Sequence, residues 1–253
     1  MTRHRNNNPS PSRGVIYGRN PVLELLKVGK RSVNKIMLSQ SAKGRVILEI
    51  VNLAKQKGIV VHNVPPEKLN KFSGNLQGIV AEVSSVEYVD LSNLIGKAKK
   101  SSKPLLVILD GVEDPHNLGA IIRNCVAFGA DGVIIPKWRA AGVNETVAKS
   151  SAGSIEHISI SRVVNTNQAI KLLKENSFWI AGVEKRGRTL ENIDLHFPAA
   201  LVIGSEGFGL HALTRKNCDF LISIPQKNTI SSLNASCASA VILYEISKKM
   251  KIF

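Results

Sequence analysis

The stretch LDGVEDPHNLGAIIRNCVAFGADGVII, residues 109–135, contains the pattern that decides the fold. It predicts a buried strand, a polar loop, a helix and a second buried strand, because apolar residues first run together and then recur at helical spacing. The loop is rich in acidic and amide side chains, whereas the helix carries a single charge, Arg123. A strand–helix–strand unit of this kind predicts two parallel strands joined by a crossover helix.

The predicted helix has an apolar stripe on one side and an almost uncharged face on the other. Gly119, Ala120 and Ala127 share this second face with Arg123. A solvated helix face normally carries several Lys or Glu side chains. We therefore expect another backbone, a ligand or a second subunit to approach here. Arg123 is then either a contact for an anion or substrate, or a surface arginine paired with an acid such as Asp114.

From residue 105 onward, predicted strands and helices alternate. This alternation predicts an α/β fold with a mostly parallel sheet and helices on both faces. In such sheets ligands bind beyond the carboxyl ends of the strands. Three of those ends run into the polar loops DGVEDPHN, GSEGFG and PQKNTISSLN, which we expect to build a site. The candidate strands are LLVILD (105–110), GVIIP (132–136), HISIS (157–161), FWIAGV (178–183), AALVIG (199–204) and FLISIP (220–225).

Residues 14–90 predict a separate and smaller α/β unit, in which Gly29 ends the first helix. Residues 91–104 are polar and basic, and we expect a linker with at most one helical stretch. Residues 1–13 are basic, lack acids and are rich in Asn, Pro and Ser, which predicts a disordered arm. A remnant of an organelle-targeting segment is the alternative for this arm. The second domain is expected to occupy residues 105–253.

Positive charge is concentrated in the front part of the chain. The net charge is +15, and residues 1–103 hold 18 Lys and Arg against 6 Asp and Glu, whereas residues 104–253 hold 16 against 13. A basic module joined to a nearly neutral one predicts docking on a polyanion, most simply a nucleic acid. The alternative is that the excess charge serves only solubility.

The remaining composition argues against several classes of protein. Cys125, Cys218 and Cys237 are far apart, and neither they nor the six histidines show the spacing of a metal site. We expect reduced, mostly buried thiols in a cytoplasmic protein, and no metal. No apolar run approaches the roughly 18 residues of a membrane-spanning helix, and the first residues lack the apolar block of a secretory signal.

Several polar residues in the three loops are candidates for a site. The glycine order in GSEGFG differs from the G-x-G-x-x-G of dinucleotide-binding folds, so a nicotinamide cofactor is not predicted. Glu206 in this loop either contacts a ligand or caps the next helix. Asn117, which follows Pro115, and Ser232 and Asn234, which precede a helix with small side chains, are all suited to helix capping.

Three stretches of the chain resemble the signature motifs of a known family. DGVEDPHNLGAIIRN, VIGSEGFGL and IPQKNTISSLNASCASAVILYE are similar, in order and spacing, to the three motifs of the SpoU/TrmH class of RNA ribose methyltransferases. IYGRNPVLELL and QGIVAEV resemble the ribosomal-protein-like RNA-binding domain that is fused to many members. The resemblance covers residues 14–250. The most similar subgroup comprises bacterial enzymes that methylate the 2′-hydroxyl of a guanosine in large-subunit ribosomal RNA.

The resemblance implies a fold, a donor and an assembly. The back half would adopt a SPOUT fold whose C-terminal segment threads a deep trefoil knot, a rare exception to the rule that chains are unknotted. The methyl donor would be S-adenosylmethionine, and the enzyme would be a homodimer with its active site near the subunit interface. A transfer RNA substrate remains open, as do a non-catalytic RNA-binding or ribosome-assembly factor on the same fold and an unrelated α/β enzyme.

The resemblance also implies roles for individual residues. The cofactor would contact backbone in the loops containing Gly204, Ile224 and Leu233. The motif positions tied to catalysis or site assembly are Asn117, Arg123, Glu206, Ser232 and Asn234.

Two features of these motifs need a physical interpretation. The family arginine is often described as the base, but arginine stays protonated in proteins. We expect Arg123 to grip the adjacent phosphate and the developing alkoxide instead. The third motif usually reads Pro-Met-x-Gly, whereas Gln226 and Asn228 stand at the two altered positions here. Asparagine tolerates positive φ better than other non-glycine residues, so a left-handed turn is predicted at Asn228.

Overall fold

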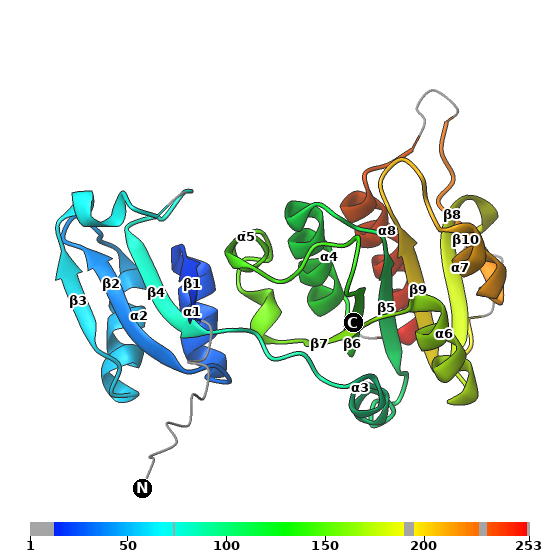
Figure 1. Ribbon diagram of the computed structural model, residues 1–253, viewed down its shortest axis with the longest axis horizontal. Helices are drawn as coiled ribbons and strands as arrows, with labels where there is room; N and C mark the ends of the chain where they lie inside the picture. Colours follow the sequence, from blue (N-terminus) through cyan, green and yellow to red (C-terminus); the bar gives the residue numbers. More distant parts are fainter. Residues whose placement is uncertain (1–12, 73, 190–194, 228–231, 252–253) are drawn as a thin grey trace, which may run out of the picture. The chain divides into compact units, whose positions relative to one another are not determined.

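The computed structural model describes residues 13–72, 74–189, 195–227 and 232–251. The chain divides into two compact units, Met1–Val86 and Glu87–Phe253 (Figure 1). Two units were predicted, and the boundary lies a few residues before the expected one. Residues 1–12 of the predicted arm and Asn228 lie outside the described residues.

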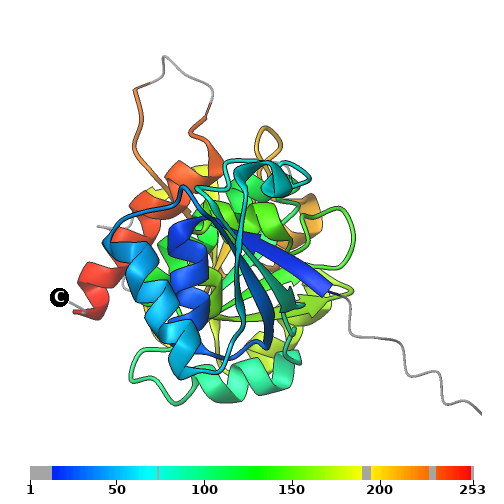
Figure 2. The same cartoon turned by 90° about the vertical axis from the view of Figure 1, so that its left-hand side faces the viewer.

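The front unit is a four-stranded mixed sheet with the strand order β1-β4-β2-β3. β4 is antiparallel to both β1 and β2, and β2 is parallel to β3. The helices α1 and α2 lie side by side (Figure 2), and α1 ends, as predicted, at Gly29, whose φ is +67°. The elements are β1 (Arg13–Tyr17), α1 (Arg19–Val28), β2 (Val33–Ser39), α2 (Arg45–Gln56), β3 (Val61–Val64), η1 (Pro66–Leu69) and β4 (Ile79–Ser84).

The back unit is a six-stranded sheet with the order β10-β8-β9-β5-β6-β7, and every pairing described in it is parallel. The predicted parallel α/β sheet is confirmed. Its elements are α3 (Leu91–Ala98), β5 (Leu105–Asp110), α4 (Pro115–Ala127), β6 (Gly132–Pro136), α5 (Glu145–Ser150), η2 (Ser154–Glu156), β7 (Ser159–Val163), α6 (Thr166–Glu175), β8 (Trp179–Thr189), β9 (Ala199–Gly204), α7 (Ala212–Asn217), β10 (Phe220–Ser223) and α8 (Ala235–Met250).

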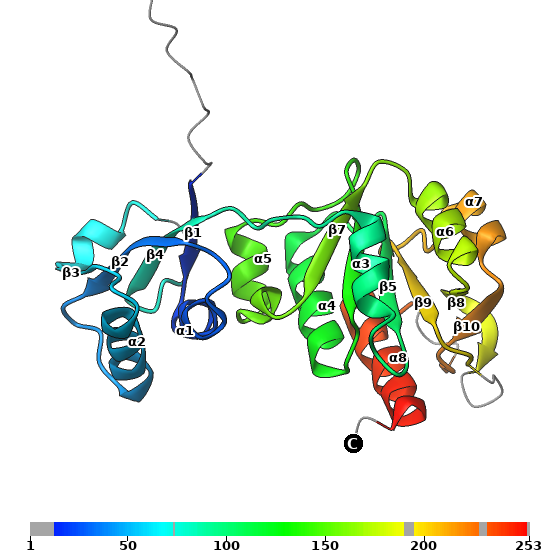
Figure 3. The same cartoon turned by 90° about the horizontal axis from the view of Figure 1, so that it is seen from below.

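Helices cover both faces of this sheet because its strands are apolar on both sides. Leu106 and Ile108 of β5 pack in one cluster with residues of α3 and α6. The side chains of Leu105 and Val107, which are also fully buried, alternate to the opposite face. α4 and α8 pack against each other there (Figure 3). No helix in the described parts of the chain is long and apolar enough to cross a bilayer.

The segment 91–104, predicted to be a linker with at most one helical stretch, does contain one helix. Its first part forms α3, whose Leu94, Ile95 and Ala98 are buried in the core of the back unit. The packing is close, because a Cβ added to Gly132 would lie 2.5 Å from Leu94 Cδ1. Lys97 lies on the exposed side of this amphipathic helix, and the exposed Lys99 and Lys100 follow its end.

Candidate active site

A tight turn follows β9 at the carboxyl edge of the back sheet. Ser205 and Gly209 exchange two backbone hydrogen bonds of 3.0 and 3.1 Å. Gly207 and Gly209 have φ values of +92° and +69°, in the region that favours glycine. A Cβ on Gly204 would lie 2.2 Å from the carbonyl carbon of Gly209. Position 204 therefore accepts only glycine unless the turn moves.

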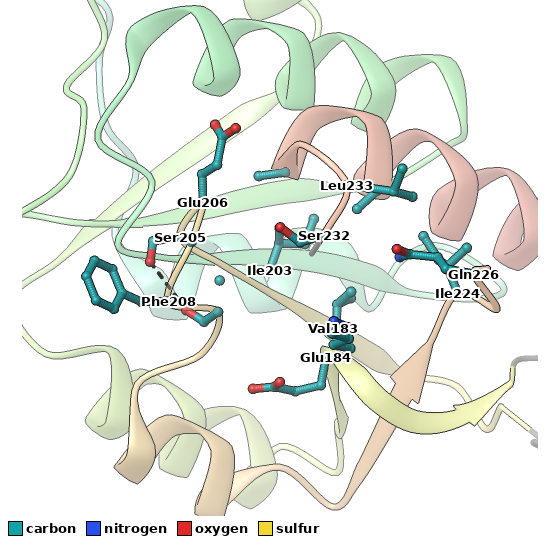
Figure 4. A pocket seen from close by; sticks show the side chains of 16 residues that line it. Val183, Glu184, Ile203, Ser205, Glu206, Phe208, Ile224, Gln226, Ser232 and Leu233 are labelled. Carbon is teal, nitrogen blue, oxygen red and sulfur yellow. Dashed lines mark hydrogen bonds between the residues drawn. The ribbon is translucent and has the colours of Figure 1, made fainter. Parts of the chain in front are cut away.

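A pocket of about 270 Å³ lies beside this turn (Figure 4). Its walls come from the middle of β8, the end of β9, the turn, the segment after β10 and the start of α8. Ile203, Ile224 and Leu233 contribute apolar surface, and Ser232 contributes a hydroxyl. Gln226 places a buried Oε1 there that has no hydrogen-bond partner among the described residues. The pocket therefore combines a mostly apolar lining with an acceptor left for a donor on a ligand, as small-molecule sites do.

Three candidate residues meet in one hydrogen-bonded group, which we call the Asn–Glu–Asn cluster: Asn117, Glu206 and Asn234. Asn117 Nδ2 donates to Glu206 Oε2 at 2.9 Å. Asn234 Nδ2 lies 3.1 Å from the same oxygen and 3.0 Å from Asn117 Oδ1. Figure 4 shows the Glu206 side chain extending from the glycine turn toward α4 at the rim of the pocket, which this residue also lines. One carboxylate thus joins the three polar loops that the sequence singled out.

The capping predictions have different outcomes. Asn234 does cap α8, since its Oδ1 accepts from the backbone N–H groups of Ser236 and Cys237 at 2.9 and 3.4 Å. Asn117 does not cap α4. That position belongs to Asp114, which accepts from the backbone N–H of His116 at 2.9 Å.

Glu206 and Ser232 are not caps either. The N-cap of α7, the helix after the glycine turn, is His211, so the capping alternative for Glu206 is wrong. Ser232 lies two residues before the cap of α8 and lines the pocket instead. Both side chains remain available to a ligand because both residues are exposed.

Arg123 is not part of the cluster. It is exposed and forms no hydrogen bond or ion pair with any other residue that the structure describes, so the expected alternative, a pair with Asp114, is not observed there. It follows Asn117 by six residues, which turns it about 120° away around the helix. The neighbouring small residue Gly119 is covered by α5 of the same chain, because an added Cβ would lie 1.9 Å from Ser150 Oγ. The close approach predicted at Gly119 is therefore internal.

Two further residues support the site and were missed from the sequence. Asn124 Nδ2 donates to Ser236 O at 3.0 Å and to Ser239 Oγ at 2.9 Å, which fixes α8 against α4. Asp110 is buried at the end of β5 and accepts from the backbone N–H of His211 at 2.9 Å, just after the glycine turn. A polar residue at a strand end was the signal for Asp110, whereas nothing in the local pattern singled out Asn124.

The three thiols differ in environment. Burial raises the pKa of the Cys125 thiol. Burial, followed by the charge of Asp219, raises the pKa of Cys218 to about 12. Cys237 is exposed, so the expectation of buried thiols is wrong for this residue. Within the described ranges, no group of three or more His, Cys, Asp and Glu is arranged to hold a metal ion.

Comparison with known proteins shows relatives along both units. Residues 104–244 match the SpoU rRNA Methylase family, and residues 15–89 match the domain described as RNA 2′-O ribose methyltransferase substrate binding. YacO of Bacillus subtilis (strain 168), which carries the name of a TrmH-family tRNA/rRNA methyltransferase, is 41% identical over 95% of this chain and 97% of its own. A protein of the same name from Staphylococcus aureus (strain COL) is 43% identical over 93% and 96%.

Solved structures share the fold. The SpoU methyltransferase AviRb from Streptomyces viridochromogenes, crystallised with the cofactor AdoMet, has a TM-score of 0.79 at 24% identity, covering 94% of this chain and 91% of its own. The TrmH/SpoU tRNA modifying enzyme of A. aeolicus has a TM-score of 0.54 at 30% identity, covering 64% and 82%.

Proposed function

Since this chain belongs to the SpoU rRNA methylase family, we propose that it methylates the 2′-hydroxyl of a guanosine ribose in large-subunit ribosomal RNA, with S-adenosylmethionine as the donor. The observation that carries the proposal is the Asn–Glu–Asn cluster beside the pocket. It gathers one residue from each of the three polar loops at the carboxyl edge of a parallel sheet, where such folds bind ligands. A cytoplasmic location follows from a ribosomal RNA substrate.

The pocket suits S-adenosylmethionine in chemistry. Backbone at Gly204, Ile224 and Leu233 would hold it, and these three residues line the pocket. The unpartnered Oε1 of Gln226 can accept a hydrogen bond from an amino group of the ligand. The bound cofactor supplies an electrophilic methyl group on a positively charged sulfur.

The protein must then favour attack by a weak nucleophile. A ribose hydroxyl is hardly ionised at neutral pH, so charge that develops on its oxygen needs stabilisation. The planar guanidinium of Arg123 can bind both that oxygen and a neighbouring phosphate, while the proton of the hydroxyl leaves to water as the methyl group is transferred. Glu206 holds the two amides of the cluster and thereby fixes the starts of α4 and α8, while the Ser232 hydroxyl at the pocket can contact the ribose.

We further propose a homodimer in which Arg123 serves the site of the partner subunit. The support is geometric: within one chain Arg123 is exposed, faces away from Asn117 around α4, and forms no hydrogen bond or ion pair with a described residue. Mixing Arg123→Ala subunits with Glu206→Ala subunits tests this arrangement, because some mixed dimers then hold one complete site. Recovery of activity on mixing is expected, and no recovery despite subunit exchange would contradict an arginine acting across the interface. The knotted path that the resemblance implies likewise stays a proposal.

The substrate is tested by supplying methyl-labelled S-adenosylmethionine with purified large-subunit ribosomal RNA or with transfer RNA, and by mapping ribose methylation. Labelled 2′-O-methylguanosine in the ribosomal RNA is the expected product. Label in transfer RNA alone would establish the alternative substrate. Binding of RNA and cofactor without transfer to either would favour a non-catalytic assembly factor.

A further inference from the structure

An exposed tryptophan lies outside the pocket, on the loop that follows β6. Trp138 is 64% exposed, although its ring is one of the largest apolar side chains in the molecule. The Nζ atom of Lys137 lies 5.0 Å from the centre of the ring, over its face. Lys137 covers one face of the Trp138 ring and leaves the opposite face accessible. An aromatic face beside a cation is the combination with which proteins bind unpaired nucleotides.

A second pair of this kind lies next to the first. The Cζ atom of Arg162 is 5.5 Å from the centre of the Tyr88 ring. Arg162 Nη2 also donates to Lys137 O at 3.1 Å, which ties β7 to the loop after β6. The Tyr88 hydroxyl accepts from the backbone N–H of Val143 at 3.1 Å and so holds the far end of that loop. The surface is therefore built by specific contacts.

Arg139 adds a third cation to this surface, which we call the Trp138 patch: Tyr88, Lys137, Trp138, Arg139 and Arg162. Arg139 is exposed and has a φ of +52°, a conformation that residues other than glycine adopt rarely and at some cost. The adjoining loop before α4 carries two exposed acids, Glu113 and Asp114, and Asp114 already accepts from His116 N at 2.9 Å as the cap of α4. Three cations with two rings give the patch the character of a site for a polyanion with aromatic groups.

The patch lies at the same edge of the sheet as the active site. In the register of the strands, Asp110 at the end of β5 is paired with Gly204 at the end of β9, and Ile108 of β5 is paired with Ile134, two residues before the end of β6. The loop after β6 therefore leaves the sheet at the edge where the glycine turn begins. β6 is two strands away from β9, which corresponds to about 10 Å. A strand of RNA whose acceptor ribose is at the pocket can reach this loop.

From these observations we infer that the Trp138 patch binds an unpaired segment of the RNA substrate, with a base stacked on Trp138 and phosphates held by Lys137, Arg139 and Arg162. The inference deepens the proposed function and rests on it. It places a substrate contact on the catalytic unit in addition to the basic front unit. It also assigns the contact to RNA flanking the methylated nucleotide, since the patch is separate from the residues that line the pocket.

The test measures binding of fluorescein-labelled oligo(U) to the full-length protein and, separately, methyl transfer to ribosomal RNA. Trp138→Ala should weaken oligo(U) binding about tenfold, and Trp138→Phe should retain most of it because a stacking face remains. Lys137→Gln with Arg139→Gln should make the dependence of log K on log salt shallower by about 1.4, at about 0.7 per phosphate contact. Methyl transfer by these variants should show a raised KM for RNA and an unchanged kcat.

Matched controls come from the same unit. Trp179, which is 45% exposed at the opposite edge of the sheet, is the control ring, and Lys171 on α6 is the control cation. Trp179→Ala and Lys171→Gln should bind oligo(U) like the parent.

The possible outcomes separate this inference from the proposed function. Unchanged oligo(U) binding in the Trp138 and Lys137/Arg139 variants would overturn the patch while leaving the methyltransferase proposal intact. An equal loss in the Trp179 control, or a change from dimer to monomer in sedimentation, would also overturn it, since the patch would then act through stability or subunit contact. A parent protein that binds oligo(U) through the patch but transfers no methyl group would instead refute the proposed function.

Discussion

The two units of the chain use their polar residues in opposite ways. In the front unit, cations such as Lys43 and Arg45 are exposed and form no ion pair within the described residues, whereas Lys35 is paired with Glu82 at 3.0 Å. In the back unit, one carboxylate collects two amides within 3.1 Å at the edge of a nearly neutral sheet. Charge attraction acts over distances near 10 Å and tolerates loose placement, whereas hydrogen bonds require fixed positions. RNA docking by the front unit should therefore tolerate changes in the positions of its cations. The site of the back unit should not tolerate shifts of its hydrogen-bonding atoms.

The largest effect is expected from removing Arg123, the cation of the back unit that we propose acts in catalysis. Arg123→Ala should lower kcat by about 10²–10³-fold, the typical effect of removing a group that stabilises transition-state charge. Arg123→Lys should also be poor, because the planar fork is lost. Cofactor titration and thermal unfolding should be unchanged, since the side chain is exposed and forms no hydrogen bond or ion pair with a described residue. Near-normal turnover in the alanine variant would contradict the role given to Arg123.

A forced shift of the glycine turn after β9 should have the next largest effect, on cofactor binding. Gly204→Ala places a Cβ 2.2 Å from the Gly209 carbonyl carbon, so the turn must shift. Overpacking of this kind costs about 1–3 kcal/mol, and binding of S-adenosylmethionine should weaken about 5- to 150-fold. Gly142→Ala is the matched control, because nothing lies within 4 Å of its added Cβ. Calorimetric titration of both variants decides whether the close contact controls the pocket.

Removal of charge from the front unit should have a smaller and more uniform effect. Lys43→Gln with Arg45→Gln should weaken binding of ribosomal RNA severalfold and reduce the salt slope by about 1.4 to 1.8, according to whether the contacted RNA is single- or double-stranded. Binding of S-adenosylmethionine should be unaffected. Equal salt slopes in parent and variant would show that these cations are not the docking surface and would shift that role toward the back unit.

The smallest effect expected concerns the thiols of the back unit. At pH 8, iodoacetamide should label the exposed Cys237 and leave Cys125 and Cys218 unmodified. A raised pKa keeps a thiol protonated, and only the thiolate reacts, so Cys218 should become reactive only as the pH approaches 12. Intact-protein mass spectrometry before and after alkylation should show one added group. Two or three groups in the folded protein would indicate looser packing around α4 and α7.

The parallel sheet could be predicted because its strands are continuous apolar runs, and three of them, β5, β6 and β9, have the expected bounds. The helical stretch allowed for in the predicted linker is α3, but its burial in the core was not foreseen, because nearby lysines outweighed the helical spacing of Leu94, Ile95 and Ala98. Composition averages over a segment, whereas burial depends on which side of a helix each residue occupies.

The members of the site were easier to predict than their arrangement. The loops were recognisable as strand ends, but the hydrogen bonds of the Asn–Glu–Asn cluster join residues 89 and 117 positions apart. No local sequence pattern specifies which residues so far apart along the chain will form a hydrogen bond. Asn117 was misjudged as a cap because Asp114, immediately before Pro115 at the first helical position, competes for the same role. The turn predicted at Asn228 lies outside the described residues and stays a prediction.

The long separations within the Asn–Glu–Asn cluster also have a consequence for how the protein is made. Synthesis proceeds from the amino end, so Asn117 is produced first and Asn234 follows 117 residues later. At about 5–20 residues per second, this interval lasts about 6 to 23 seconds. During that time Glu206 has at most one of its two amide donors, and the start of α8, which forms one wall of the pocket, does not exist. A nascent chain can thus complete its basic front unit and meet RNA well before it has a site at which to modify it.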